Sequence, residues 1–493
     1  MPRDETSWGD LPYELRAQII GLLPSLCKKF GLFASVAQEW RAIIEPLNFA
    51  SISLTVPRIN GPDSSAILFR RREQIHYIWF KIETQDYDCL RCYNQEMEFW
   101  AFDPIDDQLF VDAVERLFAI LQKWEPRGDL VLDISVFSQS DDKHWLKHLD
   151  FVPDSEFDLT GGSFAGGEKQ TSAFLEDWAH GWESGKQVTL PTENAIDQTF
   201  KEIMGQGPFE DCVAELEWWY RLPLVPVVGT VLLRQQTRRR WKPFTLQDML
   251  TLFPNLRELR YEPWRDFIGL QDVTDGHEDF IESLLRSTKL RTLTIFENFN
   301  ESYASICEEV PLIRVPSLAP SREAARLSLQ LETLSTSFIV DAGYFFSSCE
   351  EHWVWEKLTA LSLTSRTLEV EDGANMSHVN SLLREAAATA LRMPQLETLE
   401  LWTGRKGVAM LFRYQRARDG LPAVLTMRGT AGLILEGCDS VILQTSYIDP
   451  DVIRCHGDAI RYLGLLLEVV RPTSLRQILT EHYFPNSPGE VLA

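Results

Sequence analysis

The sequence has few of the features that mark secreted or membrane proteins. Its eight cysteines are scattered through 493 residues without the spacing of a disulfide framework, which favours a reducing compartment. The first ten residues, MPRDETSWGD, are polar and acidic, so no signal peptide is predicted. The longest apolar run, Leu222–Leu233, contains two prolines and a glycine and is too short to span a bilayer. We therefore expect no membrane association and a cytoplasmic and/or nuclear location.

Motifs for nucleotide binding and for hydrolysis are also missing. The glycine-rich stretch TGGSFAGG at residues 160–167 lacks the Gly-Lys-Ser/Thr ending that holds phosphate. No Gly-x-Ser-x-Gly elbow is present, and no histidine has an obvious nucleophile within sequence reach. We therefore expect a non-catalytic protein without a cofactor. The alternative is an enzyme whose site is hidden in the acidic segment 139–220.

Two short patterns contain residues of the kind that bind metals. Cys89 and Cys92 form a lone Cys-x-x-Cys pair with His76 as the only histidine nearby, whereas a structural zinc site needs four ligands. His144 and His148 would share one face of a helix, but the glutamate of a metalloprotease helix is absent and no third ligand suggests itself. We expect a surface pair of histidines and no metal site.

Positive charge is scarce, with 48 Lys and Arg against 72 Asp and Glu and a net charge of −24. An acidic chain repels phosphate backbones, so nucleic acid is not an expected partner. Residues 139–220 alone hold seventeen acidic groups against five lysines. Six basic residues and no acidic one follow in residues 221–242, and Arg238–Lys242 is a candidate nuclear-import signal or anion contact. We favour the interpretation that this cluster neutralises the acidic segment or caps a sheet edge.

Apolar residues at helical spacing are concentrated in residues 11–49. Their spacing predicts one helix with a single apolar face, followed by a second helix over Leu32–Leu47. Pro24 is expected to close or kink the first helix, and Gly31 marks a break before the second. The apolar face of the first helix consists of Leu11, Leu15, Ile19, Leu22 and Leu26.

This segment resembles an F-box. The resemblance is carried by Leu11-Pro12, Glu14-Leu15, Ile19-Ile20, Leu22-Leu23, Val36, Trp40-Arg41 and Phe49. It implies a helical module that docks on the Skp adaptor of a cullin-RING ubiquitin ligase through apolar anchors. The adaptor-binding residues that it implies are Leu11, Pro12, Leu15, Ile19, Leu22, Val36 and Trp40. The stretch CKKFGLFAS departs from the usual acidic-leucine turn of the family, and the alternative is a helical hairpin that merely covers the core behind it.

Strand-like and helix-like patterns alternate after this segment. Residues 74–84 and 129–137 read as strands, and Asp106–Trp124 between them has the spacing of an amphipathic helix. Strand, helix and strand in this order predict a parallel crossover unit. Further helices are expected at Thr171–Glu183, Asn194–Met204, Thr245–Phe253, Glu278–Ser287 and Val379–Arg392, and further strands at Val227–Arg234 and Asn255–Tyr261.

A leucine phrase recurs in the second half of the chain. Each copy holds a leucine, two residues and another leucine, and the first leucines are Leu256, Leu290, Leu331, Leu358 and Leu396. The pattern predicts an irregular leucine-rich-repeat-like α/β solenoid, in which each unit adds one strand to a continuous sheet and a helix to its convex side. The alternative is a single open α/β sheet without a true repeat.

We expect the chain to divide into five segments. They are an F-box module (1–56), first strand-helix-strand repeats (57–138), an acidic insertion (139–225), the leucine-rich-repeat-like array (226–420) and a C-terminal cap (421–493). Within the cap, short strands are predicted at Val424–Met427, Leu433–Leu435 and Val441–Gln444, before a helix over Asp451–Val470.

A second, narrower resemblance covers most of the chain. Residues 234–267, residues 293–301 and the F-box-like segment are similar to a fungal family of F-box-like proteins with a long uncharacterised C-terminal region. Together the resemblances imply a substrate-recognition subunit of an SCF-type ubiquitin ligase. Its F-box would bind the Skp adaptor, and through it a cullin, while the repeat region would bind an unknown protein substrate. The alternative is a repeat-based interaction scaffold whose F-box has diverged and acts outside any ligase.

Overall fold

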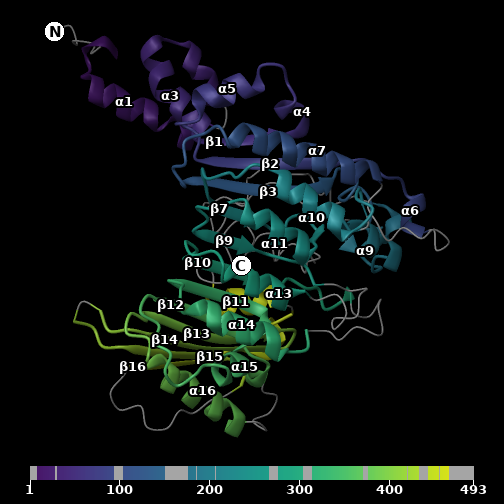
Figure 1. Cartoon of the computed structure of the whole chain (residues 1–493). Coiled ribbons are helices and arrows are strands. Elements are labelled where there is room, and N and C mark those ends of the chain that lie inside the picture. Colours follow the sequence, from purple (N-terminus) through teal and green to yellow (C-terminus); the bar gives the residue numbers. More distant parts are fainter. Residues whose placement is uncertain are drawn as a thin grey trace.

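The computed structural model describes residues 8–27, 30–93, 104–149, 151, 176–184, 186–205, 207–265, 276–303, 314–369, 376–418, 420–431, 442–454 and 456–465. These residues form a mixed α/β protein around one large, mostly parallel sheet of twelve strands (Figure 1). Among the described residues, no helix combines the length and the apolar character that crossing a bilayer requires.

The strands of the large sheet follow one another in chain order. Within this sheet the strands from β1 to β13 are parallel to one another, whereas β14 is antiparallel to both β13 and β15. The last strand, β16, lies parallel to β15 at the far edge. The bounds are β1 Ser51–Thr55, β2 Tyr77–Thr84, β3 Leu130–Ser138, β7 Val228–Leu233, β9 Glu258–Tyr261, β10 Thr292–Phe296, β11 Thr333–Asp341, β12 Ala360–Thr364, β13 Thr398–Arg405, β14 Val408–Gln415, β15 Val424–Gly429 and β16 Ile442–Tyr447.

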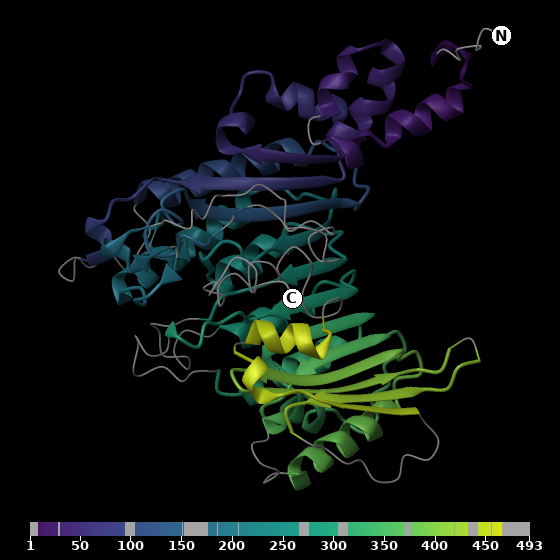
Figure 2. The same cartoon turned by 180° about the vertical axis from the view of Figure 1, so that it is seen from behind.

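Most of the helices that connect these strands cover one face of the sheet (Figure 1). The last helix, α17, lies against β13 and β14 on the opposite face (Figure 2). Helix bounds are α1 Tyr13–Gly21, α2 Leu23–Leu26, α3 Gln38–Ala50, α4 Val56–Ile59, α5 Ser64–Arg71, α6 Leu90–Tyr93, α7 Pro104–Leu121, α9 Glu193–Thr199, α10 Cys212–Arg221, α11 Pro243–Thr251, α13 His277–Leu284, α14 Leu318–Ser328, α15 Ala342–Ser347, α16 Met376–Ala390 and α17 His456–Leu463.

The leucine phrase sits in register across the sheet. The second leucine of each copy pairs with that of the next strand, and all five are buried in the main core beneath the helices: Leu259, Leu293, Leu334, Leu361 and Leu399. The first leucines of the phrase are buried in the same core. The first leucine precedes each strand. Because strand side chains alternate between the two faces, the second leucine and the residue two positions after it face the helices, whereas the residue between them faces the other side.

The other face of the sheet is buried as well. Thr294, Ser335, Ser362 and Glu400 pair in register on this face and are at most 4% exposed. A second apolar core lies on this side and joins α17 to the acidic insertion, with members that include Trp145, Leu149, Ile196, Phe200, Trp402, Leu411, Ile460 and Leu463. A strand covered on both faces is buried along nearly its whole length, as β11 is, although β11 carries the polar residues Ser335, Thr336 and Ser337 where such strands are usually apolar.

Most of the predicted strands and helices are confirmed. Residues 74–84 contain β2, Asp106–Trp124 corresponds to α7, and residues 129–137 correspond to β3. Strands β7 and β9 and helices α11, α13 and α16 also lie where the sequence predicts them. In the C-terminal segment, β15 and β16 are confirmed, whereas Leu433–Leu435 lies outside the described residues.

Three expectations are wrong in the described residues, and one strand was not predicted. The second N-terminal helix is divided into a 3-10 helix at Phe30–Ser35 and α3, which continues through Pro46. The described part of Thr171–Glu183 is a short 3-10 helix followed by a two-residue strand, in which the buried Trp182 donates its indole N–H to the Trp145 carbonyl. The strand β14 has no counterpart among the predictions, and helix α17 begins only at His456.

Candidate functional site

The N-terminal helices lie beyond the first edge of the sheet, next to β1 (Figure 1). Helix α1 packs on α3, and only Ile20 and Ile44 are buried among the described residues between 8 and 50. An ion pair of 2.8 Å between Arg16 and Glu39 joins the two helices, and a second, of 2.6 Å, joins α3 to α5. The unit is therefore held by a small core and a few polar contacts.

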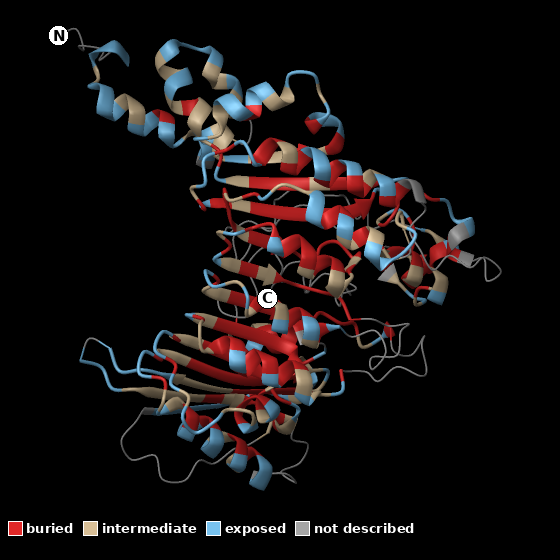
Figure 3. Cartoon of the chain, in the orientation of Figure 1, coloured by how far each residue is buried: buried red, intermediate tan, exposed pale blue. Residues whose placement is uncertain are grey.

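Most of the predicted adaptor-binding residues are exposed. Leu15, Ile19 and Leu22, which we call the exposed stripe, have 45%, 45% and 58% of their surface accessible, and Val36 has 59%. Pro12 is also exposed, and Leu11 is half-buried. Figure 3 shows these helices largely in the colours of exposed and intermediate residues, unlike the buried sheet. A single exposed leucine is ordinary on a protein surface, whereas a row of exposed apolar side chains is typical of a surface that binds a partner.

Trp40 is engaged within the N-terminal helices. It is half-buried, and its ring lies 5.7 Å from that of Trp8 and 6.1 Å from that of Phe33, between ring centroids. The side chain thus joins the short turn before α1 and the 3-10 helix to α3. Its substitution would disturb the helices themselves, so Trp40 is a poor probe of docking.

The basic cluster at Arg238–Lys242 is largely buried and paired. Arg239 forms an ion pair of 2.9 Å with Asp141, and Lys242 lies 3.4 Å from Glu215, both acidic residues of the insertion. Arg238 is fully buried, with its guanidinium 3.9 Å from the ring centre of Trp264. These contacts confirm the neutralising interpretation. An import signal requires accessible basic side chains, which Arg238 and Arg239 are not.

One residue of each of the two candidate patterns, Cys89 and His144, comes together with His180, whereas Cys92, His76 and His148 are not part of the cluster. His144 lies in a turn after β3 rather than in a helix and is buried, so the expectation of a surface pair with His148 is wrong for His144. The Sγ atom of Cys89 lies 3.4 Å from Nδ1 of His144, which is itself 3.3 Å from Nε2 of His180. The sequence offered no signal for His180, because nothing in its local pattern distinguishes it.

The surroundings of this cluster influence its ionisation. Burial lowers the pKa of His144, although the Tyr87 carbonyl opposes that shift. Burial alone would raise the pKa of Asp177, but hydrogen bonds from Lys147 and His180 hold it below its usual range. Cys92 lies outside the cluster, and burial raises the pKa of its thiol to about 12. Cys92 is therefore held as a neutral, unreactive thiol.

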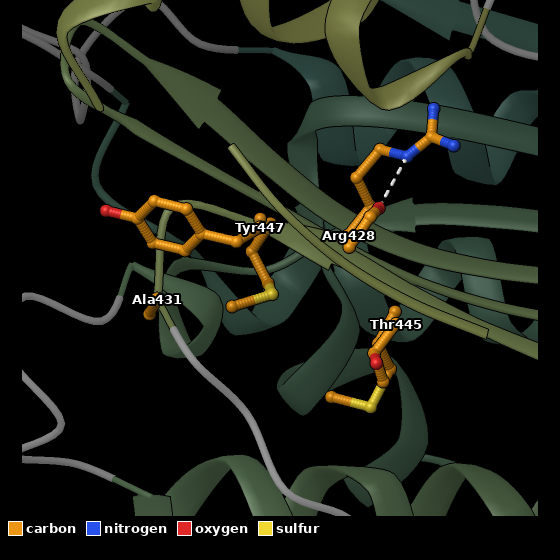
Figure 4. A pocket seen from close by; sticks show the side chains of 8 residues that line it. Arg428, Ala431, Thr445 and Tyr447 are labelled. Atoms are coloured by element: carbon orange, nitrogen blue, oxygen red, sulfur yellow. Dashed lines mark hydrogen bonds between the residues drawn. The ribbon is translucent and has the colours of Figure 1, made fainter. Parts of the chain in front are cut away.

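A shallow pocket lies at the opposite end of the sheet, on β14, β15 and β16 (Figure 4). Its lining includes Met410, Met427 and Tyr447, and Nε of Arg428 donates to Oγ of Ser446 at 3.0 Å. The edge strand β16 beside it is exposed along residues 443–447. Among the described residues β16 pairs only with β15, and an exposed edge strand beside flexible methionines is suited to binding an extended segment.

The fold and these surfaces define a mixed α/β protein with an exposed helical unit at one end of its sheet. Residues 285–471 are similar to a family of unknown function, DUF6546. This similarity begins at the end of α13 and includes α17, and it covers less than half of the chain. No F-box family was matched, and no curated protein matches the chain.

Proposed function

We propose that this chain is a non-catalytic, substrate-recruiting subunit of a cullin-RING ubiquitin ligase. Its N-terminal helices would bind a Skp-type adaptor, and its leucine-rich-repeat-like array would bind a protein substrate. The observation that carries the proposal is the exposed stripe, where Leu15 and Ile19 in α1 and Leu22 at its C-cap recur at helical spacing and are 45%, 45% and 58% exposed. Such a role would place the chain in the cytoplasm or the nucleus.

The position of the helices supports the same proposal. They adjoin β1, whereas the pocket and the exposed edge strand adjoin β16, eleven strand spacings away. With neighbouring strands about 4.8 Å apart, the two ends are separated by about 50 Å along the sheet. A rigid spacer of this length would keep the adaptor and the substrate apart while fixing their relative position. The contribution to catalysis would be proximity, supplied without any catalytic group of the chain.

The substrate would bind at the far edge of the sheet rather than on its faces. The two faces are covered by helices and by the second core, so Ser335 and Ser362 are not accessible. The β16 edge could accept an extended peptide as an added strand, with a side chain entering the pocket beside Tyr447.

Co-purification of the full chain with a Skp-type adaptor tests the proposal. The diagnostic variant is Leu15→Asp/Ile19→Asp, because both side chains are 45% exposed and neither belongs to the buried core, and a thermal melt beside the wild type checks that it folds. The matched control is Leu391→Asp, at an 87% exposed leucine after α16. We expect the wild type and the control to retain the adaptor and the double variant to lose it.

Each other outcome has a definite meaning. If the wild type itself fails to bind, the ligase proposal is wrong and the chain is better treated as a repeat-based scaffold with a diverged F-box. If all three proteins bind equally, the adaptor contacts a different surface, and the role assigned to the exposed stripe is wrong.

A further inference from the structure

Three segments of the chain bring metal-binding atoms to one point. Cys89 precedes α6, His144 lies in the turn after β3, and His180 ends the 3-10 helix Trp178–His180 in the acidic insertion. Their ligand atoms all lie within 4.8 Å of one another. The two histidines are buried, whereas Cys89 is exposed, so the cluster opens toward solvent on the cysteine side.

The outer nitrogen of each ring faces a group that can only accept a hydrogen bond. Nε2 of His144 lies 3.2 Å from the Tyr87 carbonyl oxygen, and Nδ1 of His180 lies 2.8 Å from a carboxylate oxygen of Asp177. Both outer nitrogens must therefore carry the proton, which fixes the tautomer of each neutral ring. The inner nitrogens, 3.3 Å apart, then direct lone pairs at each other, an arrangement that a cation between them would stabilise.

Two of the three separations between the inner atoms match the edges of a metal coordination shell, and the third, between Cys89 Sγ and His180, is at most 4.8 Å. With metal–nitrogen bonds of about 2.0 Å and a metal–sulfur bond of about 2.3 Å, tetrahedral zinc holds two nitrogens about 3.3 Å apart and a sulfur about 3.5 Å from a nitrogen. The observed separations are 3.3 Å between the two nitrogens and 3.4 Å between Cys89 Sγ and His144 Nδ1. A carbonyl or carboxylate on the outer nitrogen is also the usual support of a metal-bound histidine.

We propose that Cys89, His144 and His180 bind one divalent transition-metal ion of the zinc class. Two imidazoles and a thiolate are borderline-soft ligands, which favour zinc over magnesium or calcium. Asp177, itself held by Lys147 at 2.6 Å, is a positioning residue that orients His180. Three protein ligands leave a fourth position on the solvent side, and the ion joins the loop after β2, the turn after β3 and the insertion. This proposal does not depend on adaptor binding.

The test is metal titration of the full chain after treatment with a chelator, using Zn²⁺ alone and Co²⁺ alone. We expect one equivalent of either ion to bind, and the Co²⁺ form to show thiolate-to-cobalt charge-transfer absorption. Cys89→Ser should lose that absorption, whereas Cys212→Ser, at another exposed cysteine, should retain it. Asp177→Asn should keep the stoichiometry but bind the ion about 10–100-fold more weakly.

Thermal melts in the absence of metal distinguish the loss of the metal site from a loss of folding. Cys89 is exposed, so Cys89→Ser should melt with the wild type in the absence of metal, and added Zn²⁺ should raise the melting temperature of the wild type only. The proposal is wrong if the wild type binds no ion, if it binds Co²⁺ without the thiolate absorption, or if Cys89→Ser binds as tightly as Cys212→Ser.

Discussion

The ion pair between Arg239 and Asp141 predicts a large loss of stability when the arginine is removed. The two side chains are 2% and 1% exposed, and Nη2 of Arg239 lies 2.9 Å from the carboxylate. Arg239 also donates to the carbonyls of Gln198 and Thr199, at the end of α9. One guanidinium therefore joins two parts of the insertion, the turn after β3 and the end of α9. Burial raises the pKa of Asp141, and Arg239 is the main contact that opposes this shift.

The size of the loss follows from what Arg239→Met leaves behind. Asp141 would stay buried, with the backbone N–H of Ser138 at 3.0 Å and the hydroxyl of Tyr87 at 3.1 Å as its remaining donors. Breaking a buried ion pair by removing one partner costs about 3–5 kcal/mol, because the other charge loses its compensation. We expect the free energy of unfolding to fall by about 4 kcal/mol. Adding Asp141→Asn removes the stranded charge and should recover about half of this loss.

Urea denaturation followed by tryptophan fluorescence measures these differences through the transition midpoint, provided that the slope is unchanged. Arg418→Met is the matched control, since the side chains of Arg418 and of its ion-pair partner Glu397 are 61% and 45% exposed and such a pair is worth at most about 1 kcal/mol. The reasoning is refuted if Arg239→Met unfolds at the same urea concentration as this control. It is also refuted if the double variant is less stable than Arg239→Met alone.

Two further predictions concern the main core. Burial, and then the charge of Glu215, raises the pKa of Asp248 to about 6. A carboxyl group whose pKa is raised in the folded state destabilises the fold once it is ionised. The wild type therefore keeps its full free energy of unfolding below about pH 4 and loses part of it as the pH rises through 6. Asp248→Asn should be more stable than the wild type by up to about 3 kcal/mol at pH 8 and equal to it at pH 4. Equal midpoint differences at both pH values would contradict this cause. Leu361→Ala should lower the free energy of unfolding by about 2–5 kcal/mol, because this leucine is 1% exposed and lies in the row of paired leucines beneath the helices. Leu391→Ala, the control, should change it hardly at all. Similar urea midpoints for the two variants would contradict the register.

The alternation of strands and helices could be predicted because its causes are local. In four copies of the phrase, the second leucine and the apolar residue two positions after it have the period of a strand, and helix α7 has the spacing of one buried face. The same local logic identified the exposed stripe, since apolar residues at helical spacing are visible whether or not anything covers them. It failed at residues 30–35, where a 3-10 helix replaces the first turns of the expected α-helix.

The sequence by itself determined which segments form strands and helices and which residues of α1 share a face. Only the tertiary structure decided that Arg239 meets Asp141, that the second face of the sheet is covered, and that Cys89, His144 and His180 converge. Periodicity reports the burial of a residue within its own element, but it carries no information about which distant segment lies opposite. These contacts join residues from 36 to 98 positions apart, and they exist because the parallel sheet brings successive strand ends to one edge.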